Sequence, residues 1–436
     1  MPLLLEKFAS RDSLRQRRGR AGRVRSGTCY KLVSKKTFDG LRQHGEPEIH
    51  RCALDQTLLS LMFLGAERGN GEFFSTLLDP PAKDSIDAAI SSLIQVGAIE
   101  RQKDSVLKLT PLGCHLAGIP APPRIGKLLI MGSLLGVRDS ALAIAAGVSV
   151  GRSPFLRVNV FQQKKSGDAE ENPQDVRDRE VIKEREELLK KVGNSDHALL
   201  ADIYSTWANP SGGGKKQLCD TLGLSFNGMR DIKKLYSQLD SSLSQAGFKD
   251  GLNANINVGS MRIVRACVVS AFAPSQLVKI RRPNLKFNKT VGGGVEKDTE
   301  AKELKFYVRG QDGNEERVFI HPTSANFNMG VYSCPWLVYN ELVRTSKAFL
   351  RDVTECSSYA LLLFGGKIQV QAAKEVIVID DWAKLAAAPR IGALIGGLRK
   401  KVDEILVKKI SDPRLEVEYT PEMKLIVRLL ASEGLA

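Results

Sequence analysis

The sequence has 436 residues, of which 43% are hydrophobic and 26% are charged, and its formal net charge is +15. This length accommodates several domains with apolar cores, and this composition excludes a disordered chain. The positive charge favours a nucleic acid or another phosphate-rich partner. No apolar segment has the length of a membrane span, and the seven cysteines form no C-x-x-C pair. We therefore expect an intracellular protein with no membrane partner, no disulfide framework and no metal site.

An arginine-rich stretch, QRRGRAGR (Gln16–Arg23), lies near the start of the chain. Seven arginines occur between Arg11 and Arg25, and Asp12 is the single carboxylate among them. Arginines this dense repel one another, and their planar side chains pair well with phosphate, so we expect a polyanion to bind here. A solvated basic helix without a particular ligand is the alternative.

Helix signals surround this stretch. Ser10 is a good N-cap, so a helix is predicted to run through the arginines and to place Gln16, Arg20 and Arg23 on one face. Glycines such as Gly19 cost about 1 kcal/mol each in a helix interior relative to alanine. That cost is understandable where a ligand or another backbone must approach closely.

The following region predicts two helices and a hairpin. Ala53–Leu64 is an apolar segment that ends at Gly65, a second helix is expected from a cap at Ser85 to Val96, and AIERQKDSVLKLT alternates like a hairpin. Two helices followed by a hairpin are typical of a winged-helix domain. Such domains often bind DNA by themselves, but this region has no arginine-rich recognition helix.

Helical spacing of apolar residues continues from about residue 120 to residue 250, which predicts a helical bundle. Thr110 and Pro111 indicate the start of a short helix, and a long apolar helix is expected from Arg124. Residues 162–191 are highly charged with mixed signs. They predict a solvated loop followed by a surface helix.

After about residue 257 the sequence changes to short β-branched segments separated by turn residues. RIVRACVVSAF, KELKFYVR, ERVFIHP, ALLLFGGKIQVQ and EVIVIDDW each predict a strand, and together they predict an all-β domain of about five strands. Two amphipathic helices are expected after this domain.

A basic stretch, KIRRPNLKFNK (Lys279–Lys289), lies within the β-rich region. It carries five cations, no carboxylate and one aromatic residue. This mixture suits a groove in which cations follow the phosphates of a single strand while a ring stacks on a base. The candidate RNA-binding residues are Lys279, Arg281, Arg282, Lys286 and Phe287. The alternative is a solvated loop with Phe287 in the core.

Several segments resemble the DEAH/RNA helicase A family of superfamily 2 helicases. Gln16–Arg23 is similar to motif VI, Q-R-x-G-R-x-G-R, and GTCYKLVSKKTF resembles the family segment that follows it. LTPLGCHLAGIP is similar to the signature L-T-x-L-G-x-x-L-A-x-L-P. IHPTS and YNELVRTSKAFLRDVT resemble the signatures H-P-S-S and Y-x-E-x-x-x-T-x-x-x-Y-L-R-D-x-T of the family's oligonucleotide-binding (OB) fold.

The resemblance implies a multidomain α+β chain. Its expected domains are the C-terminal remnant of a second RecA-like domain with motif VI (1–52), a winged helix (53–118), a helical ratchet or helicase-associated HA2 bundle with the charged insertion 162–191 (119–256), a β-barrel OB-fold (257–385) and a C-terminal helical extension (386–436).

The resemblance also implies a function. In the family, the glutamine and the last two arginines of motif VI face the γ-phosphate of ATP, a role that falls on Gln16, Arg20 and Arg23, with Gly19 close to the nucleotide. The arginines would act as arginine fingers in an ATP-dependent helicase that binds ATP with Mg²⁺ and moves along single-stranded RNA. The chain looks most like the branch that assists translation initiation on the small ribosomal subunit. We therefore expect a cytoplasmic rather than a nuclear protein.

The sequence departs from the family in one respect. It contains no Walker A loop and no D-E-x-H box, which an ATP-dependent helicase needs to hold the phosphates and the metal. This chain alone is therefore expected neither to bind ATP tightly nor to hydrolyse it. A truncated, non-enzymatic RNA- or ribosome-binding adaptor is the alternative.

Overall fold

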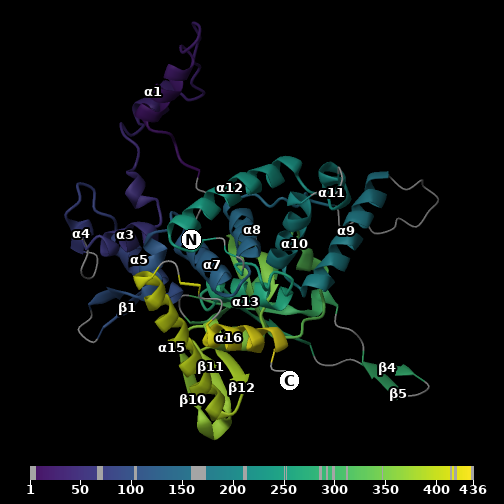
Figure 1. Ribbon diagram of the computed structural model, residues 1–436. Helices are drawn as coiled ribbons and strands as arrows, with labels where there is room; N and C mark the ends of the chain where they lie inside the picture. The colour runs from purple at the N-terminus through teal and green to yellow at the C-terminus, as the bar shows by residue number, and fades with distance from the viewer. Residues whose placement is uncertain are drawn as a thin grey trace. The chain divides into compact units, whose positions relative to one another are not determined.

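The structure is a computed structural model. It describes residues 6–65, 72–102, 106–158, 173–209, 214–249, 251, 253–283, 287–290, 293–296, 300–310, 313–345, 347–412, 415–416 and 420–433. The chain divides into two units, Met1–Ile90 and Ser91–Ala436, and Figure 1 shows their helices and strands.

The first unit begins with α1 (Arg11–Arg20), whose N-cap is Ser10 as predicted: its hydroxyl accepts a hydrogen bond from the N–H of Ser13. The helix ends at Arg20, so the prediction that Arg23 continues the helical face is wrong. Residues 22–25 form turns and bends instead. The second glycine of the motif thus lies beyond the helix, where it carries no helical cost.

The remaining helices of this unit are α2 (Lys35–Asp39), the 3₁₀ turn η1 (Glu48–His50), α3 (Asp55–Phe63) and α4 (Glu72–Ser75), followed by α5 (Lys83–Val96), which reaches the second unit. Gly65 follows α3 with φ +72°, as expected of a glycine that ends a helix. Ser85 lies inside α5, so its prediction as an N-cap is wrong. None of the described residues 6–50 is buried.

The second unit starts with the predicted hairpin, in which β1 (Ile99–Arg101) pairs antiparallel with β2 (Leu107–Leu109). Thr110 then caps α6 (Pro111–Ala117): its Oγ1 accepts from the N–H of Gly113 at 3.0 Å and donates to the carbonyl of Gly97 at 2.6 Å. The helices and the hairpin are of the predicted kinds, and their arrangement as a winged helix stays a prediction.

A helical bundle follows, as predicted. Its helices are α7 (Pro123–Leu134), α8 (Arg138–Ser149), α9 (Pro173–Val192), α10 (Asp196–Ala208), α11 (Lys215–Thr221), α12 (Phe226–Gln245) and α13 (Met261–Phe272). The central helix α8 packs against α7, α10 and α12, and α7 packs against α13 (Figure 1). The charged helix α9 is a surface helix with one buried face, which contains Val181, Arg185 and Leu189.

One predicted strand and the first half of another are helices, while the second half of ALLLFGGKIQVQ is the strand β10 (Ile368–Gln371). RIVRACVVSAF forms most of α13, and ALLLF lies in α14 (Ser358–Phe364). Residues 266–272 of α13 are all buried because neighbours cover the helix on several sides: α7, α10, α14 and two barrel strands. Only the first turn and Arg265 reach the surface, so the rest of the helix is a nearly continuous apolar sequence that is indistinguishable from that of a buried strand.

Five strands close the predicted barrel: β3 (Leu277–Arg281), β6 (Lys305–Arg309), β7 (Glu315–Ile320), β8 (Trp336–Arg344) and β9 (Ala348–Glu355), in the order β3-β6-β7-β9-β8. Neighbouring strands are antiparallel except β7 and β9, which are parallel. Alternate side chains such as Val278, Phe306, Val318 and Leu350 fill the interior.

A separate hairpin, β4 (Phe287–Thr290) and β5 (Gly293–Glu296), lies between β3 and β6 in the chain. Lys286 lies outside the described residues, and so does the side chain of Phe287.

The last part of the chain has its own sheet, in which β10 (Ile368–Gln371), β11 (Val376–Ile379) and β12 (Ala383–Ala386) pair antiparallel. EVIVIDDW is therefore a strand, but it does not belong to the barrel. The two expected terminal helices are α15 (Pro389–Ser411) and α16 (Pro421–Ser432). Arg399 fixes α15 to the end of α14 by donating to the carbonyls of Leu362 and Gly365, both at 3.1 Å.

Candidate functional site

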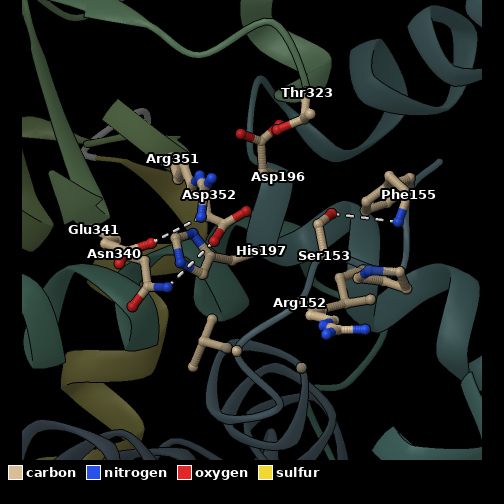
Figure 2. A pocket seen from close by; sticks show the side chains of 15 residues that line it. Arg152, Ser153, Phe155, Asp196, His197, Thr323, Asn340, Glu341, Arg351 and Asp352 are labelled. Atoms are coloured by element: carbon tan, nitrogen blue, oxygen red, sulfur yellow. Dashed lines mark hydrogen bonds and ion pairs between the residues drawn. The ribbon is translucent and has the colours of Figure 1, made fainter. Parts of the chain in front are cut away.

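A cavity of about 330 Å³ lies between the helical bundle and the barrel. The bundle contributes residues of α8, of the segment 151–155 and of α10, and the barrel contributes Thr323, Asn340, Glu341, Arg351 and Asp352. Figure 2 shows His197 between these strand residues and the segment that carries Arg152, Ser153 and Phe155. The lining is therefore both polar and apolar, which suits a ligand that presents charged and flat apolar parts.

Asp196, at the start of α10, joins the helical bundle to the barrel. Its buried carboxylate accepts hydrogen bonds from the Oγ of Ser324 at 2.6 Å, the N–H of Ala325 at 3.0 Å, the Nδ2 of Asn326 at 3.0 Å and the N–H of Val353 at 2.9 Å. Burial raises the pKa of Asp196 to about 6, although three of these hydrogen bonds favour the ionised form. One side chain thus satisfies four donors from the barrel.

Two neighbours of Asp196 strengthen this junction. The Oγ of Ser195 and the Nδ1 of His197 each lie 2.7 Å from the Oγ1 of Thr354 in β9. Burial lowers the pKa of His197 to about 3, so the ring is neutral at physiological pH. Its buried Nε2 has no hydrogen-bond partner in the described part of the chain. The ring lines the cavity and also packs against the ring of Phe272, with centres 5.2 Å apart.

The charged groups of the cavity lining are two arginines and the three carboxylates of Asp196, Glu341 and Asp352. Arg152 is exposed, and Arg351 contacts Glu341 at 3.2 Å while both side chains stay about 40% exposed. Burial raises the pKa of Asp352, although Asn340 donates to its carboxylate at 3.2 Å. Arg152 is therefore exposed to an incoming phosphate, whereas Arg351 would exchange its ion pair with Glu341 for a phosphate contact.

Arg185 of α9 supports the wall of the cavity. Its guanidinium donates to the carbonyls of Leu222 at 2.9 Å, Gly223 at 2.8 Å and Leu156 at 3.2 Å, and it lies over the ring of Phe155 at 5.1 Å. Phe155 lines the cavity. The charged helix that follows the insertion thus positions a residue of the site.

The two signatures attributed to the OB-fold meet at this junction. IHPTS supplies Thr323 and Ser324, and RDVT supplies Arg351, Asp352 and Thr354. The sequence signal was therefore present, but no role was assigned to these residues from sequence. Their partners on α10, Ser195, Asp196 and His197, lie outside the signatures, and so does the cavity residue Arg152. No sequence pattern therefore indicated that these residues belong to the site.

The arginine-rich helix of the first unit is largely exposed. Gln16, Gly19, Arg20 and Arg23 are all exposed, and within the described residues Gln16, Arg20 and Arg23 have no hydrogen-bond or ion-pair partner. The start of α1 is held by the N–H of Arg11, which donates to the carbonyl of Arg42 at 2.9 Å. The arginines of the motif are therefore open to a ligand.

The basic stretch predicted from the sequence lies at the end of β3, apart from the cavity lining. Lys279 contacts Glu315 at 3.0 Å, and Arg281 also pairs with this carboxylate. Arg282 donates to the carbonyl of Tyr332. Burial raises the pKa of Glu315, but the hydrogen bonds from Lys279 and Trp382 outweigh this effect, and the pKa is lowered. These cations are thus partly engaged within the chain.

The described residues contain neither a candidate metal site nor a disulfide. Among the described residues, no group of three or more histidine, cysteine or carboxylate side chains could hold a metal ion. All seven cysteines are free: four are buried, Cys29 and Cys52 are exposed and Cys114 is half-buried. No helix of the described residues combines the length and the hydropathy of a membrane span.

Three family models match the chain. They are the ratchet-like helicase-associated domain HA2 at residues 122–200, the oligonucleotide/oligosaccharide-binding (OB) fold at residues 264–368 and the C-terminal domain in RNA helicases at residues 375–432. The first covers α7, α8, α9 and the start of α10, the second covers most of α13, the barrel and α14, and the third covers the last sheet strands and the terminal helices.

Curated relatives match almost the whole chain. The ATP-dependent DNA/RNA helicase DHX36 of Mus musculus is 32% identical over 93% of this chain, and the DExH-box ATP-dependent RNA helicase DExH1 of Arabidopsis thaliana is 32% identical over 99%. The ATP-dependent RNA helicase dhx29 of Xenopus laevis is 31% identical over 99%.

The chain belongs to the DEAH/RNA helicase A family. It spans 38%, 39% and 30% of the lengths of these three relatives, respectively. Its matched domains are those of the helicase-associated region: the ratchet bundle, the OB-fold and the C-terminal domain.

Proposed function

We propose that this chain is the C-terminal portion of an ATP-dependent RNA helicase, and that the cavity between its ratchet bundle and its barrel holds the backbone of single-stranded RNA. The cavity offers the exposed Arg152 and the 40% exposed side chain of Arg351. The observation that carries the proposal is the set of hydrogen bonds at Asp196. Residues of the two family signatures donate to its carboxylate and thereby join the two walls of this cavity.

Contacts of this kind are mainly to phosphates. Arg152 and Arg351 can pair with phosphate oxygens, which carry no sequence information, so binding would be weakly sequence-selective and strongly dependent on salt. Phe155, which is half-buried in the cavity wall, adds a flat apolar surface on which a base can rest.

In an intact parent, α1 would contribute to ATP hydrolysis. We propose that Gln16, Arg20 and Arg23 face the γ-phosphate of ATP bound with Mg²⁺ by a Walker A loop and a D-E-x-H box outside this sequence. Their exposure and the nearly full exposure of Val24 and Leu32, both 98%, support a segment that completes a larger RecA-like domain. The chain alone would then neither bind ATP tightly nor hydrolyse it.

Translocation would follow from the two sites together. ATP would bring the RecA-like domains together over the arginines, and hydrolysis would release them, while the ratchet and the barrel grip the strand. Because Asp196, Ser195 and His197 join the ratchet bundle to the barrel by hydrogen bonds, these two domains would move together as one rigid body.

The alternative function is a non-enzymatic RNA- or ribosome-binding adaptor made of the same domains. It shares the cavity and lacks the ATP cycle. Association with the small ribosomal subunit and a cytoplasmic location are part of the proposal in both versions.

The ATPase assay separates the two functions. A parent chain that carries a Walker A loop and a D-E-x-H box in frame should hydrolyse ATP faster when single-stranded RNA is added. Such a parent that binds RNA but shows no RNA-stimulated turnover would favour the adaptor.

A further inference from the structure

The surface helix α9 lies behind the cavity wall, and its buried face is only partly apolar. This face contains three aliphatic residues, Val181, Leu189 and Val192, and two charged residues, Asp178 and Arg185. Burial lowers the pKa of Arg185 to about 10, so the guanidinium stays charged at physiological pH. A buried cation loses its hydration and needs other acceptors in place of water. The docking of α9 therefore depends on the hydrogen bonds that Arg185 makes.

These hydrogen bonds reach two segments that lie far apart in the sequence. The guanidinium donates to the carbonyl of Leu156 at 3.2 Å and to those of Leu222 and Gly223 at 2.9 and 2.8 Å. Gly223 has φ +59°, and a Cβ atom there would lie 2.9 Å from the Nη2 of Arg185. The loop at residues 222–225 thus approaches the guanidinium as closely as a glycine permits.

The two segments also pair with each other. The N–H of Leu156 donates to the carbonyl of Gly223 at 2.8 Å, and Phe155 forms an isolated antiparallel bridge with Leu224. Because Arg185 donates to carbonyls on both sides of this pairing, it fixes the pair to α9 as one assembly.

The segment held in this way carries residues of the cavity. Arg152 and Phe155 line the cavity, and the Oγ of Ser153 accepts from the N–H of Phe155 at 3.2 Å (Figure 2). The guanidinium of Arg185 lies 5.1 Å from the centre of the Phe155 ring, a cation–π contact that favours one orientation of the ring. The positions of Phe155 and Arg152 therefore depend on whether α9 is docked.

The outer face of α9 is solvated, and its inner face is small. Arg177, Glu180 and Lys183 are exposed on it, with charges of both signs. The helix buries five of its 20 residues, whereas α8 and α10, which line the cavity, bury nine of 12 and nine of 13. An element with few buried apolar contacts opens at a lower free energy than its neighbours. We therefore expect α9 to undock while α8 and α10 stay in place.

We propose that α9 is a clamp on the cavity and that Arg185 is its positioning residue: the docked helix holds Phe155 and Arg152 in the arrangement that binds single-stranded RNA, and bound RNA holds α9 docked. The inference rests on the proposed function of the cavity and adds its regulation. Arg185 lies outside the cavity lining and acts through Phe155. The coupling is reciprocal, so that if undocking weakens binding about tenfold, binding disfavours undocking by the same factor.

The first test measures hydrogen exchange in the wild-type chain with and without a saturating uridine oligomer of about twelve nucleotides. The backbone amides of α9 should exchange about tenfold more slowly when the oligomer is bound. Slower exchange at residues 152–156 with unchanged exchange in α9 would overturn the clamp and leave the cavity standing. Failure of the wild-type chain to bind the oligomer would remove the proposed function together with the clamp.

The second test compares Arg185→Gln, Phe155→Leu and the double variant. Arg185→Gln should weaken binding of the oligomer roughly tenfold, which is the effect of losing one base stack. The double variant should bind no more weakly than Arg185→Gln, because the two side chains act through one contact. A loss equal to the product of the two single losses would overturn the clamp.

Two controls and a stability measurement accompany these variants. Arg177→Gln, at an exposed arginine of α9, and Arg428→Gln, at an exposed arginine of α16, should bind as the wild type does. Urea unfolding of Arg185→Gln identifies a purely structural role. A lower unfolding midpoint with wild-type affinity of the folded chain would overturn the clamp.

Discussion

The hydroxyl groups of Ser195 and Thr354 lie 2.7 Å apart, although 159 positions separate the two residues in the sequence. Ser195 also caps α10 by accepting from the N–H of Ala198 at 3.0 Å. The residue that starts the helix is thus also the residue that fixes it to β9. This double role explains how the first turn of α10 holds the cavity between the bundle and the barrel in shape.

Removal of the Asp196 carboxylate should open this junction. Asp196→Ala leaves four buried donors without an acceptor, and we expect a loss of about 2–4 kcal/mol in the free energy of unfolding at pH 7. Urea unfolding measures it. Asp202→Ala, on the same helix, is the control and should cost less than about 1 kcal/mol. Equal losses in the two variants would show that the junction contributes no special stability.

Acid should weaken the fold through His197. Its pKa is about 3 in the folded chain and 6.5 in the unfolded chain, so the unfolded state binds the proton first. Stability from this group is complete above pH 6.5 and is lost as the pH falls, by about 1.4 kcal/mol per unit. At pH 5 the loss is about 2 kcal/mol.

The variant His197→Gln isolates this effect. Asp196 titrates in an overlapping range with the opposite sign, because its folded pKa of about 6 lies above 3.8 and protonation between these values stabilises the fold. Asp196 is present in both proteins, so its effect cancels in the difference between them. Between pH 7 and pH 5 the wild type should lose about 2 kcal/mol more than His197→Gln; parallel curves would contradict a neutral buried ring.

Motif VI should act on ATP turnover and hardly on RNA binding. In an intact parent, Arg20→Ala or Arg23→Ala should lower the rate of RNA-stimulated ATP hydrolysis by about 10³-fold or more, as for other arginine fingers. Arg18→Ala, an exposed arginine of the same helix at the variable position of the motif, is the control. If all three variants lose RNA affinity and keep their turnover, α1 is an RNA-binding helix, which is the simpler interpretation of its sequence.

Glu315 should limit the affinity of the barrel for RNA. Its carboxylate holds Lys279 at 3.0 Å and also pairs with Arg281. Glu315→Gln would release these cations to phosphates, so the affinity for single-stranded RNA should rise several-fold and the salt slope should become steeper by up to about 1.4, or 0.7 for each new contact. Unchanged affinity would show that neither cation lies on the RNA path.

The sequence predicted those elements whose signals are local. The caps at Ser10 and Thr110 are confirmed because a cap depends on a residue and the next three positions. Alternation predicted β6 and β7 for the same reason. By contrast, α13 was predicted as a strand, since its buried residues 266–272 form a short apolar sequence that shows too little of the helical period.

The candidate site was predictable only in part. The two family signatures contain Thr323, Ser324, Arg351 and Thr354, but their meeting at one site involves Asp196, more than a hundred residues away. No local pattern distinguishes this aspartate from any other at the start of a helix. Long-range hydrogen bonds of this kind appear only in the folded chain.

The salt dependence of RNA binding tests the central claim, that single-stranded RNA lies in the cavity, most directly. Affinity of this chain for a uridine oligomer is measured from low to high salt for the wild type, for the double variant Arg152→Gln with Arg351→Gln, and for the control Arg428→Gln. The account predicts a slope flatter by about 1.4 in the double variant, 0.7 for each lost phosphate contact, with the control unchanged. A double variant with the slope and affinity of the wild type would contradict it.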